Sequence, residues 1–115
     1  MNWYLAKVIF RIGIGPEENA SQFDEHLRLI QADNFEEAFV KARMIGITEE
    51  DNFINNQEQL VKWEFVNVAE LIPLKELSDG LEVYSQIHET EEARSYIHAV
   101  HQKAATLQMN HSPAF

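Results

Sequence analysis

The 115-residue sequence contains no cysteine. This absence excludes disulfide bonds, a thiol nucleophile and a cysteine-ligated metal, and it fits a reducing, cytoplasmic compartment. Long apolar runs are missing as well: none approaches the ~20 residues that a membrane helix needs. The apolar start is interrupted by Lys7 and Arg11 and follows no basic region, so we expect no signal peptide.

Basic residues are scarce, with 9 Lys and Arg against 19 Asp and Glu, which gives a net charge of −10. Such a field repels nucleic acid and anionic lipid, so we expect neither as a partner. Hydrophobic residues make up 45% of the chain, which is typical of a folded protein. We predict one α+β domain over residues 1–107 and a frayed C-terminal tail over residues 108–115.

Period-two alternation predicts a long first strand over residues 3–14, because every even position from 4 to 14 is apolar. A polar loop at 17–22 leads to a second strand at 24–32, which we expect to pair antiparallel with the first. Asn34 is the expected N-cap of a helix that carries apolar residues at helical spacing. Gly46 is the expected left-handed terminator of that helix.

In the second half, residues 48–52 are compatible with a short helical turn, and Asn55-Asn56 with a hairpin tip. A strand follows over 59–71, and its change of apolar phase at Val66 indicates a bulge or burial of both faces. Alternation at 81–87 predicts a last strand, and Thr90 is the expected cap of a final helix. The predicted fold is an antiparallel β-sheet with two helices packed on one face, in the order β-β-α-β(hairpin)-β-α.

Four short motifs occur in succession along the chain. They are Trp3-Tyr4-Leu5-Ala6-Lys7, Ile30-Gln31-Ala32 with Phe35-Glu36-Glu37-Ala38, Lys62-Trp63-Glu64-Phe65-Val66-Asn67-Val68, and Asp79-Gly80-Leu81-Glu82-Val83-Tyr84-Ser85. This succession resembles the bacterial family called domain of unknown function 4288 (DUF4288) over roughly residues 3–87. The resemblance implies a small bacterial domain without an assigned activity or catalytic residues. Asn55-Asn56 stands where such sequences are expected to have a hairpin glycine.

The chain has five histidines, of which His98 and His101 are three apart on the predicted final helix. Two side chains on one helical face can reach one metal ion, but a zinc site needs a third ligand and further support. His88 precedes the helix and would have to fold back to join them. We therefore interpret the pair as solvated side chains and expect no metal and no cofactor.

The acidic pairs have a structural interpretation. Glu36 and Glu37, like Glu91 and Glu92, are expected in first helical turns, where the helix dipole favours negative charge. Catalytic carboxylate pairs need unlike environments, which nothing in these pairs indicates. The sequence therefore predicts no catalytic residue, and we interpret the protein as non-enzymatic.

The odd positions of the first strand include three apolar residues, Trp3, Leu5 and Ile9. A sheet covered by helices on one side buries only one face of this strand, which leaves these three for a partner. We therefore predict a protein–protein interaction module, as a homodimer or with another protein. Two alternatives stay open: the segment 60–74 folds over this face, or the protein is a small enzyme or ligand-binding domain that uses the sheet face and the histidines.

Overall fold

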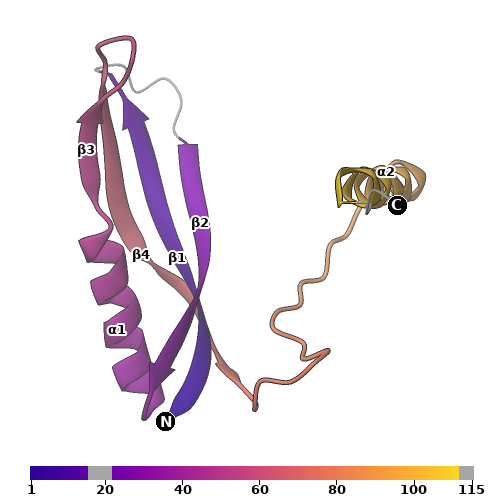
Figure 1. Ribbon diagram of the computed structural model, residues 1–115, viewed down its shortest axis with the longest axis horizontal. Coiled ribbons are helices and arrows are strands. Elements are labelled where there is room, and N and C mark those ends of the chain that lie inside the picture. Colours follow the sequence, from indigo (N-terminus) through magenta and orange to yellow (C-terminus); the bar gives the residue numbers. More distant parts are fainter. Residues whose placement is uncertain (16–21, 112–115) are drawn as a thin grey trace. The chain divides into compact units, whose positions relative to one another are not determined.

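The computed structural model describes residues 1–15 and 22–111 (Figure 1). The helices and strands are, in order, β1 (Asn2–Ile14), β2 (Gln22–Ala32), α1 (Phe35–Thr48), β3 (Asp51–Ile54), β4 (Leu60–Leu74) and α2 (Ala93–His111). The chain divides into two compact units, Met1–Val83 and Tyr84–Phe115. The first holds the sheet and α1, and the second holds α2. The predicted α+β class, with an antiparallel sheet and two helices, is confirmed.

The four strands form one sheet in the order β2-β1-β4-β3, and every pair is antiparallel. The pairing of β1 with β2 runs without interruption, whereas β4 shifts its register twice against β1, skipping Ala69 and Val66. The predicted bulge at Val66 is therefore confirmed. The alternative in which segment 60–74 folds over the first strand is wrong, because this segment lies beside β1 in the sheet.

The core lies between α1 and the even-numbered residues of β1. It consists of Tyr4, Ala6, Val8, Phe10, Ile30, Ala32, Ala38 and Ala42, with Trp63 and Phe65 of β4 packed against it. At the start of α1, Asn34 Oδ1 accepts a hydrogen bond from the Glu37 backbone N–H at 2.8 Å. This confirms the predicted N-cap, which fixes the residue at which α1 begins.

The predicted role of Gly46 is wrong. α1 continues past it to Thr48, and Glu49 occupies the C-cap position with an ordinary right-handed backbone. Gly46 is instead buried against the ring of Phe65, so its missing side chain serves close packing of helix on sheet. Because the helix is longer than expected, β3 begins at Asp51, where a further helical turn was predicted.

The β3–β4 turn is organised by Asn55, whose Oδ1 accepts hydrogen bonds from the backbone N–H groups of Gln57 and Gln59 at 2.9 and 3.0 Å. The hairpin predicted at Asn55-Asn56 is thus present. The positive φ, however, falls on Glu58 at 60°, rather than on either asparagine. An Asx turn therefore replaces the glycine turn expected from the family resemblance.

The last predicted strand is wrong, because residues 81–90 have no regular secondary structure. Alternation alone does not form a strand; a partner edge must also satisfy the backbone hydrogen bonds. Thr90 Oγ1 accepts from the Glu92 N–H at 3.0 Å, but α2 begins at Ala93, so Glu91 and Glu92 precede its first turn.

α2 continues to His111, four residues beyond the predicted limit of the domain, and residues 112–115 lie outside the described part. Most of the loop predicted at 17–22 also lies outside the described residues. That one domain spans residues 1–107, and that α2 packs beside α1 on the sheet, both stay predictions. Neither helix of the described chain is long and apolar enough to span a membrane.

Candidate functional site

The sheet has a second face, opposite the side that packs on α1. It is formed by the odd-numbered residues of β1 and their neighbours in β2 and β4, which are Trp3, Leu5, Lys7, Ile9, Arg11, Phe23, Glu25, Leu27, Leu29, Gln31, Glu64, Asn67, Glu70, Ile72 and Leu74. We call this surface the second face. Its apolar members gather toward the end of the sheet where β1 begins and β4 ends.

The predicted partner-binding residues share this face but differ in accessibility. Leu5 is only 5% exposed although it is outside the core beneath α1, and Trp3 and Ile9 are partly buried. The accessible apolar surface comes instead from β2, where Phe23, Leu27 and Leu29 are 58%, 55% and 51% exposed. Sequence reasoning missed these three for the interaction surface. Their spacing at odd positions was the available signal.

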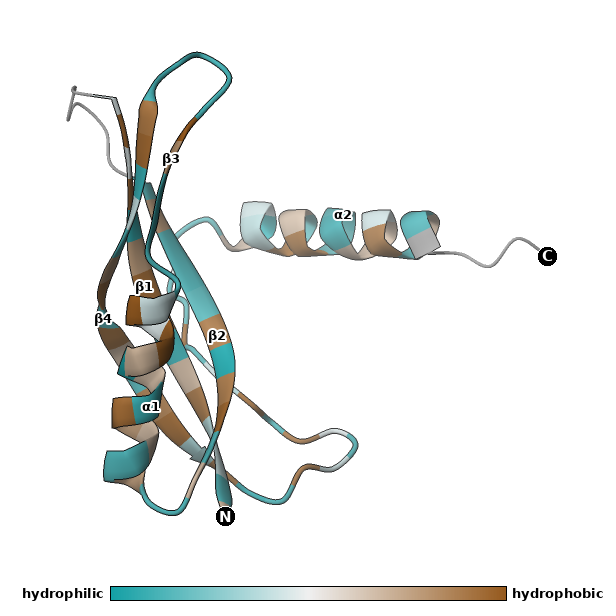
Figure 2. Cartoon of the chain, turned by 60° about the vertical axis from the view of Figure 1, so that its left-hand side comes forward, coloured by the Kyte–Doolittle hydropathy of each residue, from teal (hydrophilic) through white to brown (hydrophobic). Residues whose placement is uncertain are grey.

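Over residues 23–29 the polarity of β2 is largely inverted, because its polar residues at even positions lie on the side facing α1. Figure 2 shows hydrophilic and hydrophobic stretches along this strand, and its last apolar residues, Ile30 and Ala32, face the core in the ordinary way. A half-solvated strand ordinarily turns apolar residues to the core and polar ones to water. In β2, Asp24, His26 and Arg28 share the α1 side, while leucines occupy the exposed side.

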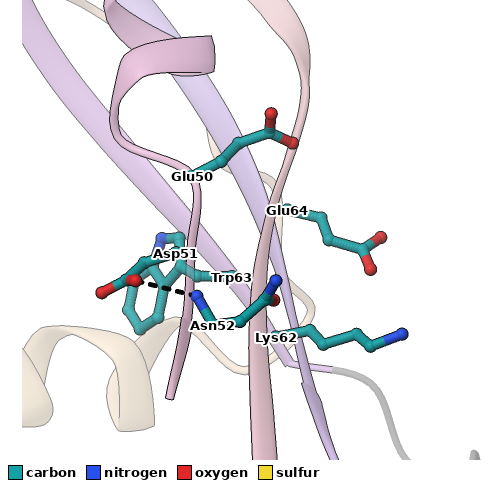
Figure 3. Close-up of a pocket in the computed structure, with 6 residues that line it drawn as sticks. All are labelled: Glu50, Asp51, Asn52, Lys62, Trp63 and Glu64. Carbon is teal, nitrogen blue, oxygen red and sulfur yellow. Dashed lines mark hydrogen bonds between the residues drawn. The ribbon is translucent and has the colours of Figure 1, made fainter.

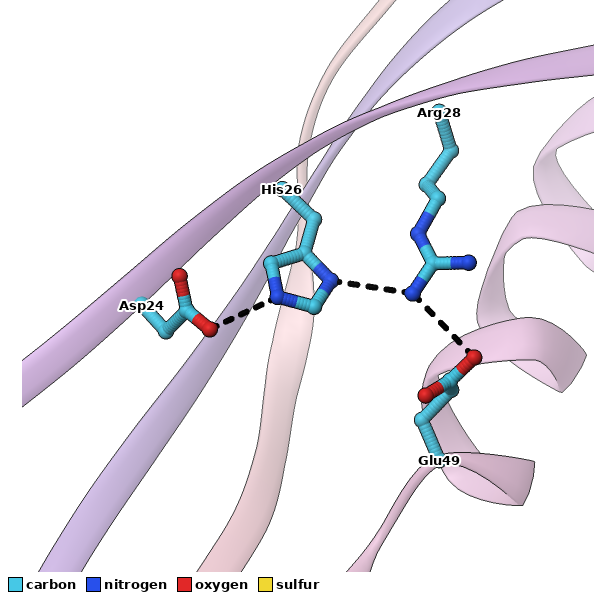
Figure 4. A network of polar contacts seen from close by, with 4 residues as sticks. All are labelled: Asp24, His26, Arg28 and Glu49. Carbon is cyan, nitrogen blue, oxygen red and sulfur yellow. Dashed lines mark hydrogen bonds and ion pairs between the residues drawn. The ribbon is translucent and has the colours of Figure 1, made fainter.

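Those three polar residues form a chain of contacts with Glu49 at the end of α1 (Figure 4). Asp24 Oδ2 lies 2.7 Å from His26 Nε2, and Arg28 Nη2 lies 3.1 Å from both His26 Nδ1 and Glu49 Oε1. A guanidinium only donates hydrogen bonds, so His26 Nδ1 accepts one from Arg28. In neutral histidine the hydrogen is then on Nε2, which donates a hydrogen bond to Asp24. Both ring nitrogens are therefore occupied. The network tethers β2 to α1 and leaves no histidine nitrogen free to activate a nucleophile.

A polar hollow of about 610 Å³ lies at the β3–β4 hairpin, lined by Glu50, Asp51, Asn52, Lys62, Trp63 and Glu64. Trp63 and Asp51 extend to one side of the hairpin, and Lys62 and Glu64 to the other (Figure 3). Glu50 Oε2 accepts from the Phe65 N–H at 3.0 Å, and Asp51 Oδ1 from the Asn52 N–H at 2.8 Å. Two of the three carboxylates thus already bond the backbone, and all three are exposed. The hollow is part of the solvated hairpin surface.

The histidines of the second unit do not form a ligand set. His98 and His101 are exposed on α2, and His88 stacks on Tyr96 with ring centroids 5.0 Å apart. Across residues 1–15 and 22–111, no group of three or more potential ligands is placed to hold a metal ion. Two exposed histidines without a third ligand fall short of a zinc site.

These features define a small α+β domain with an antiparallel sheet. The chain belongs to the family described as domain of unknown function (DUF4288), whose sequence model matches residues 3–85. This range coincides closely with the sheet-bearing unit and confirms the family resemblance read from the motifs. Comparisons with curated proteins and with solved structures each find no match.

Proposed function

We propose that this protein is a non-enzymatic protein–protein interaction module that acts as a homodimer through the second face of its sheet. The proposal rests on one observation, the exposure of Phe23, Leu27 and Leu29 on that face, where Leu27 and Leu29 are neighbours and Glu25 lies between Leu27 and Phe23. Together with the partly buried Trp3 and Ile9, they form an apolar area of the kind that monomers rarely leave in water.

The inverted polarity of β2 strengthens this interpretation. Solvent contact alone would favour polar residues at positions 23, 27 and 29, because each apolar side chain gains ~1.5–3 kcal/mol on full burial and gains nothing in water. Three large apolar residues at these positions are explained by contact with another surface. A twofold interface suits such a patch, since one surface then serves both subunits.

The second face also carries charges, some of which lie between its apolar members and already form pairs within the chain. Lys7 Nζ lies 3.0 Å from Glu25 Oε1, and Arg11 lies opposite Glu64 in the strand register. With a net charge of −10, the chain is a poor ligand for nucleic acid or anionic membranes and a better one for a protein. Its lack of cysteine supports a cytoplasmic location.

Sedimentation equilibrium at micromolar concentration tests the proposal. The unmodified chain should have twice the 13.3 kDa monomer mass, and Leu27→Glu should reduce it to the monomer. Val40→Glu is the matched control, because Val40 is 58% exposed on α1 and receives the same new charge. It should leave the dimer intact. A monomer in the unmodified protein, with no change on Leu27→Glu, would contradict the proposed function.

A further inference from the structure

β2 forms one edge of the sheet along 11 residues, and its pairing with β1 contains neither bulge nor register shift. The opposite edge is irregular, because β3 has four residues and pairs only with the first residues of β4. A long, regular edge presents unpaired backbone groups that readily pair with another strand. The edge therefore offers a second copy a place to extend the sheet.

One end of this edge is already occupied. Lys41 Nζ of α1 donates to the backbone oxygen of Gln31 at 2.5 Å. The register of a symmetric pairing is set by the residue that lies on its twofold axis. The side chains that lie directly opposite each other in each register decide which register is favoured.

We propose that two copies of the chain pair antiparallel through their β2 edges, with His26 opposite His26, to form one eight-stranded sheet. The inference rests on the proposed function and names the contact between the two copies. Because the twofold axis lies at position 26, the numbers of two residues that lie directly opposite each other in the two copies add up to 52. Asp24 of each copy then lies opposite Arg28 of the other, and Phe23 opposite Leu29.

The register is supported by the Asp24–Arg28 pair on the α1 side and by the Phe23–Leu29 pair on the second face, while Glu25 and Leu27 are a neutral match. Opposite charges directly across antiparallel strands stabilise the pair, as do apolar pairs, whereas like charges destabilise it. Both recorded contacts of Arg28 use Nη2, which leaves its other guanidinium nitrogens for Asp24 of the second copy. Each favourable pair occurs twice because of the symmetry.

The neighbouring registers that keep the same faces together are poorer. An axis at Glu25 places two glutamates directly opposite each other. An axis at Leu27 sets Phe23 against Gln31, whose carbonyl already accepts from Lys41, and leaves Asp24 opposite Ile30. The axis at His26 alone among these three aligns Asp24 with Arg28. The charged residues on the α1 side therefore select one register against its neighbours.

The pairing also gives two of the exposed apolar residues of β2 a partner. It places Phe23 of each copy opposite Leu29 of the other, whereas Leu27 lies opposite Glu25. The second faces of the two copies become neighbours in one continuous sheet.

A charge-complementation experiment tests the register. Phe23→Lys and Leu29→Glu each replace an exposed side chain, so the fold should persist, which circular dichroism verifies. Each variant alone should raise the dimer dissociation constant at least about tenfold, since the change occurs twice at the interface. An equimolar mixture should restore association. The heterodimer then has one native Phe–Leu pair and one lysine–glutamate pair, and its recovery should weaken with salt.

Mixing Phe23→Lys with Leu29→Lys is the control, because it places like charges opposite each other at the same two positions; no recovery is expected. If the unmodified chain is a dimer but the complementary mixture fails to associate, the proposed register of the β2 edges is wrong, whereas the proposed function as a protein–protein interaction module is retained. If either single variant dimerises as tightly as the unmodified chain, the register is likewise wrong. If the unmodified chain is monomeric, both proposals fail.

Discussion

Gly46 of α1 lies against the ring of Phe65 of β4, and a Cβ atom at position 46 would overlap ring atoms Cδ1 and Cε1. The helix can therefore approach the sheet at this point only because residue 46 has no side chain. The contact joins the end of α1 to the middle of the sheet, next to the network of Glu49 and Arg28.

We expect Gly46→Ala to lower the free energy of unfolding by ~2 kcal/mol, because so close an overlap puts the overpacking cost near the upper end of ~1–3 kcal/mol, against a helix-propensity gain of ~1 kcal/mol. Met44→Ala, at an exposed position of the same helix, should change it by less than ~0.5 kcal/mol. Urea denaturation measures both. Phe65→Leu should couple favourably with Gly46→Ala in a double-mutant cycle. Equal stability of the Gly46→Ala and unmodified proteins would contradict the overlap.

Glu58 has a φ of 60°, a left-handed conformation that glycine adopts without steric cost. We expect Glu58→Gly to raise the free energy of unfolding by ~0.5–1 kcal/mol. Gln57→Gly, one position earlier in the same turn, is the control and should give no gain, because Gln57 does not have a positive φ. Thermal melting compares the two. Equal gains from both variants would indicate that turn flexibility, not backbone strain, is responsible.

The neutral form of His26 should carry its proton on Nε2, because Arg28 donates to Nδ1. Long-range ¹H–¹⁵N correlation spectra distinguish the two tautomers. The exposed His98 provides an internal comparison and should show a mixture of both. Arg28→Met removes the group that donates to Nδ1, so we expect this variant to abolish the preference for one tautomer. A neutral His26 with its proton on Nδ1 would overturn the assigned direction of the network.

The sequence of α2 places apolar residues at helical spacing in one stripe, which comprises Ala93, Tyr96, Ile97, Val100, Ala104 and Leu107, and Lys103 lies outside it. If the stripe packs against the rest of the chain, Ile97→Asp should cost several times more stability than Lys103→Asp, because burying isoleucine contributes ~1.5–3 kcal/mol. Denaturant midpoints of the two variants make the comparison. Identical midpoints would show that the stripe is not packed.

Zinc should not affect stability, because His98 and His101 have no third ligand among the described residues. Thermal melting with a chelator and then with added zinc should give the same transition temperature. The variant His98→Ala should respond in the same way. A decrease on chelation that zinc reverses, and that His98→Ala abolishes, would establish a metal site.

Local patterns predicted the elements whose signals are both long and regular. The alternation over residues 3–14 predicted β1, and Asn34 with Glu37 predicted the start of α1, because these signals depend only on near neighbours. The segment 81–87 shows the limit of such signals. It alternates as β1 does, yet it forms no strand, since a strand also requires a partner edge.

The candidate interaction surface was predicted in part. Trp3, Leu5 and Ile9 were assigned correctly to one side of β1, but how much of each is exposed depends on non-local packing, which the pattern does not contain. The contacts of His26 were not anticipated. Its alternation with Asp24 and Arg28 places the three on one side of a strand, but their distance from Glu49 depends on where α1 ends.

The sequence by itself determined the α+β class, the antiparallel pairing of the first two strands, the helix cap and the family, because turn lengths, periodicity and short motifs are local properties. Tertiary structure alone decided that β4 lies between β1 and β3, that Gly46 serves close packing, and that β2 directs its leucines outward at an edge of the sheet. The physical reason is that a period of two assigns residues to two faces of a strand, whereas contacts between distant segments decide which face and which edge are covered.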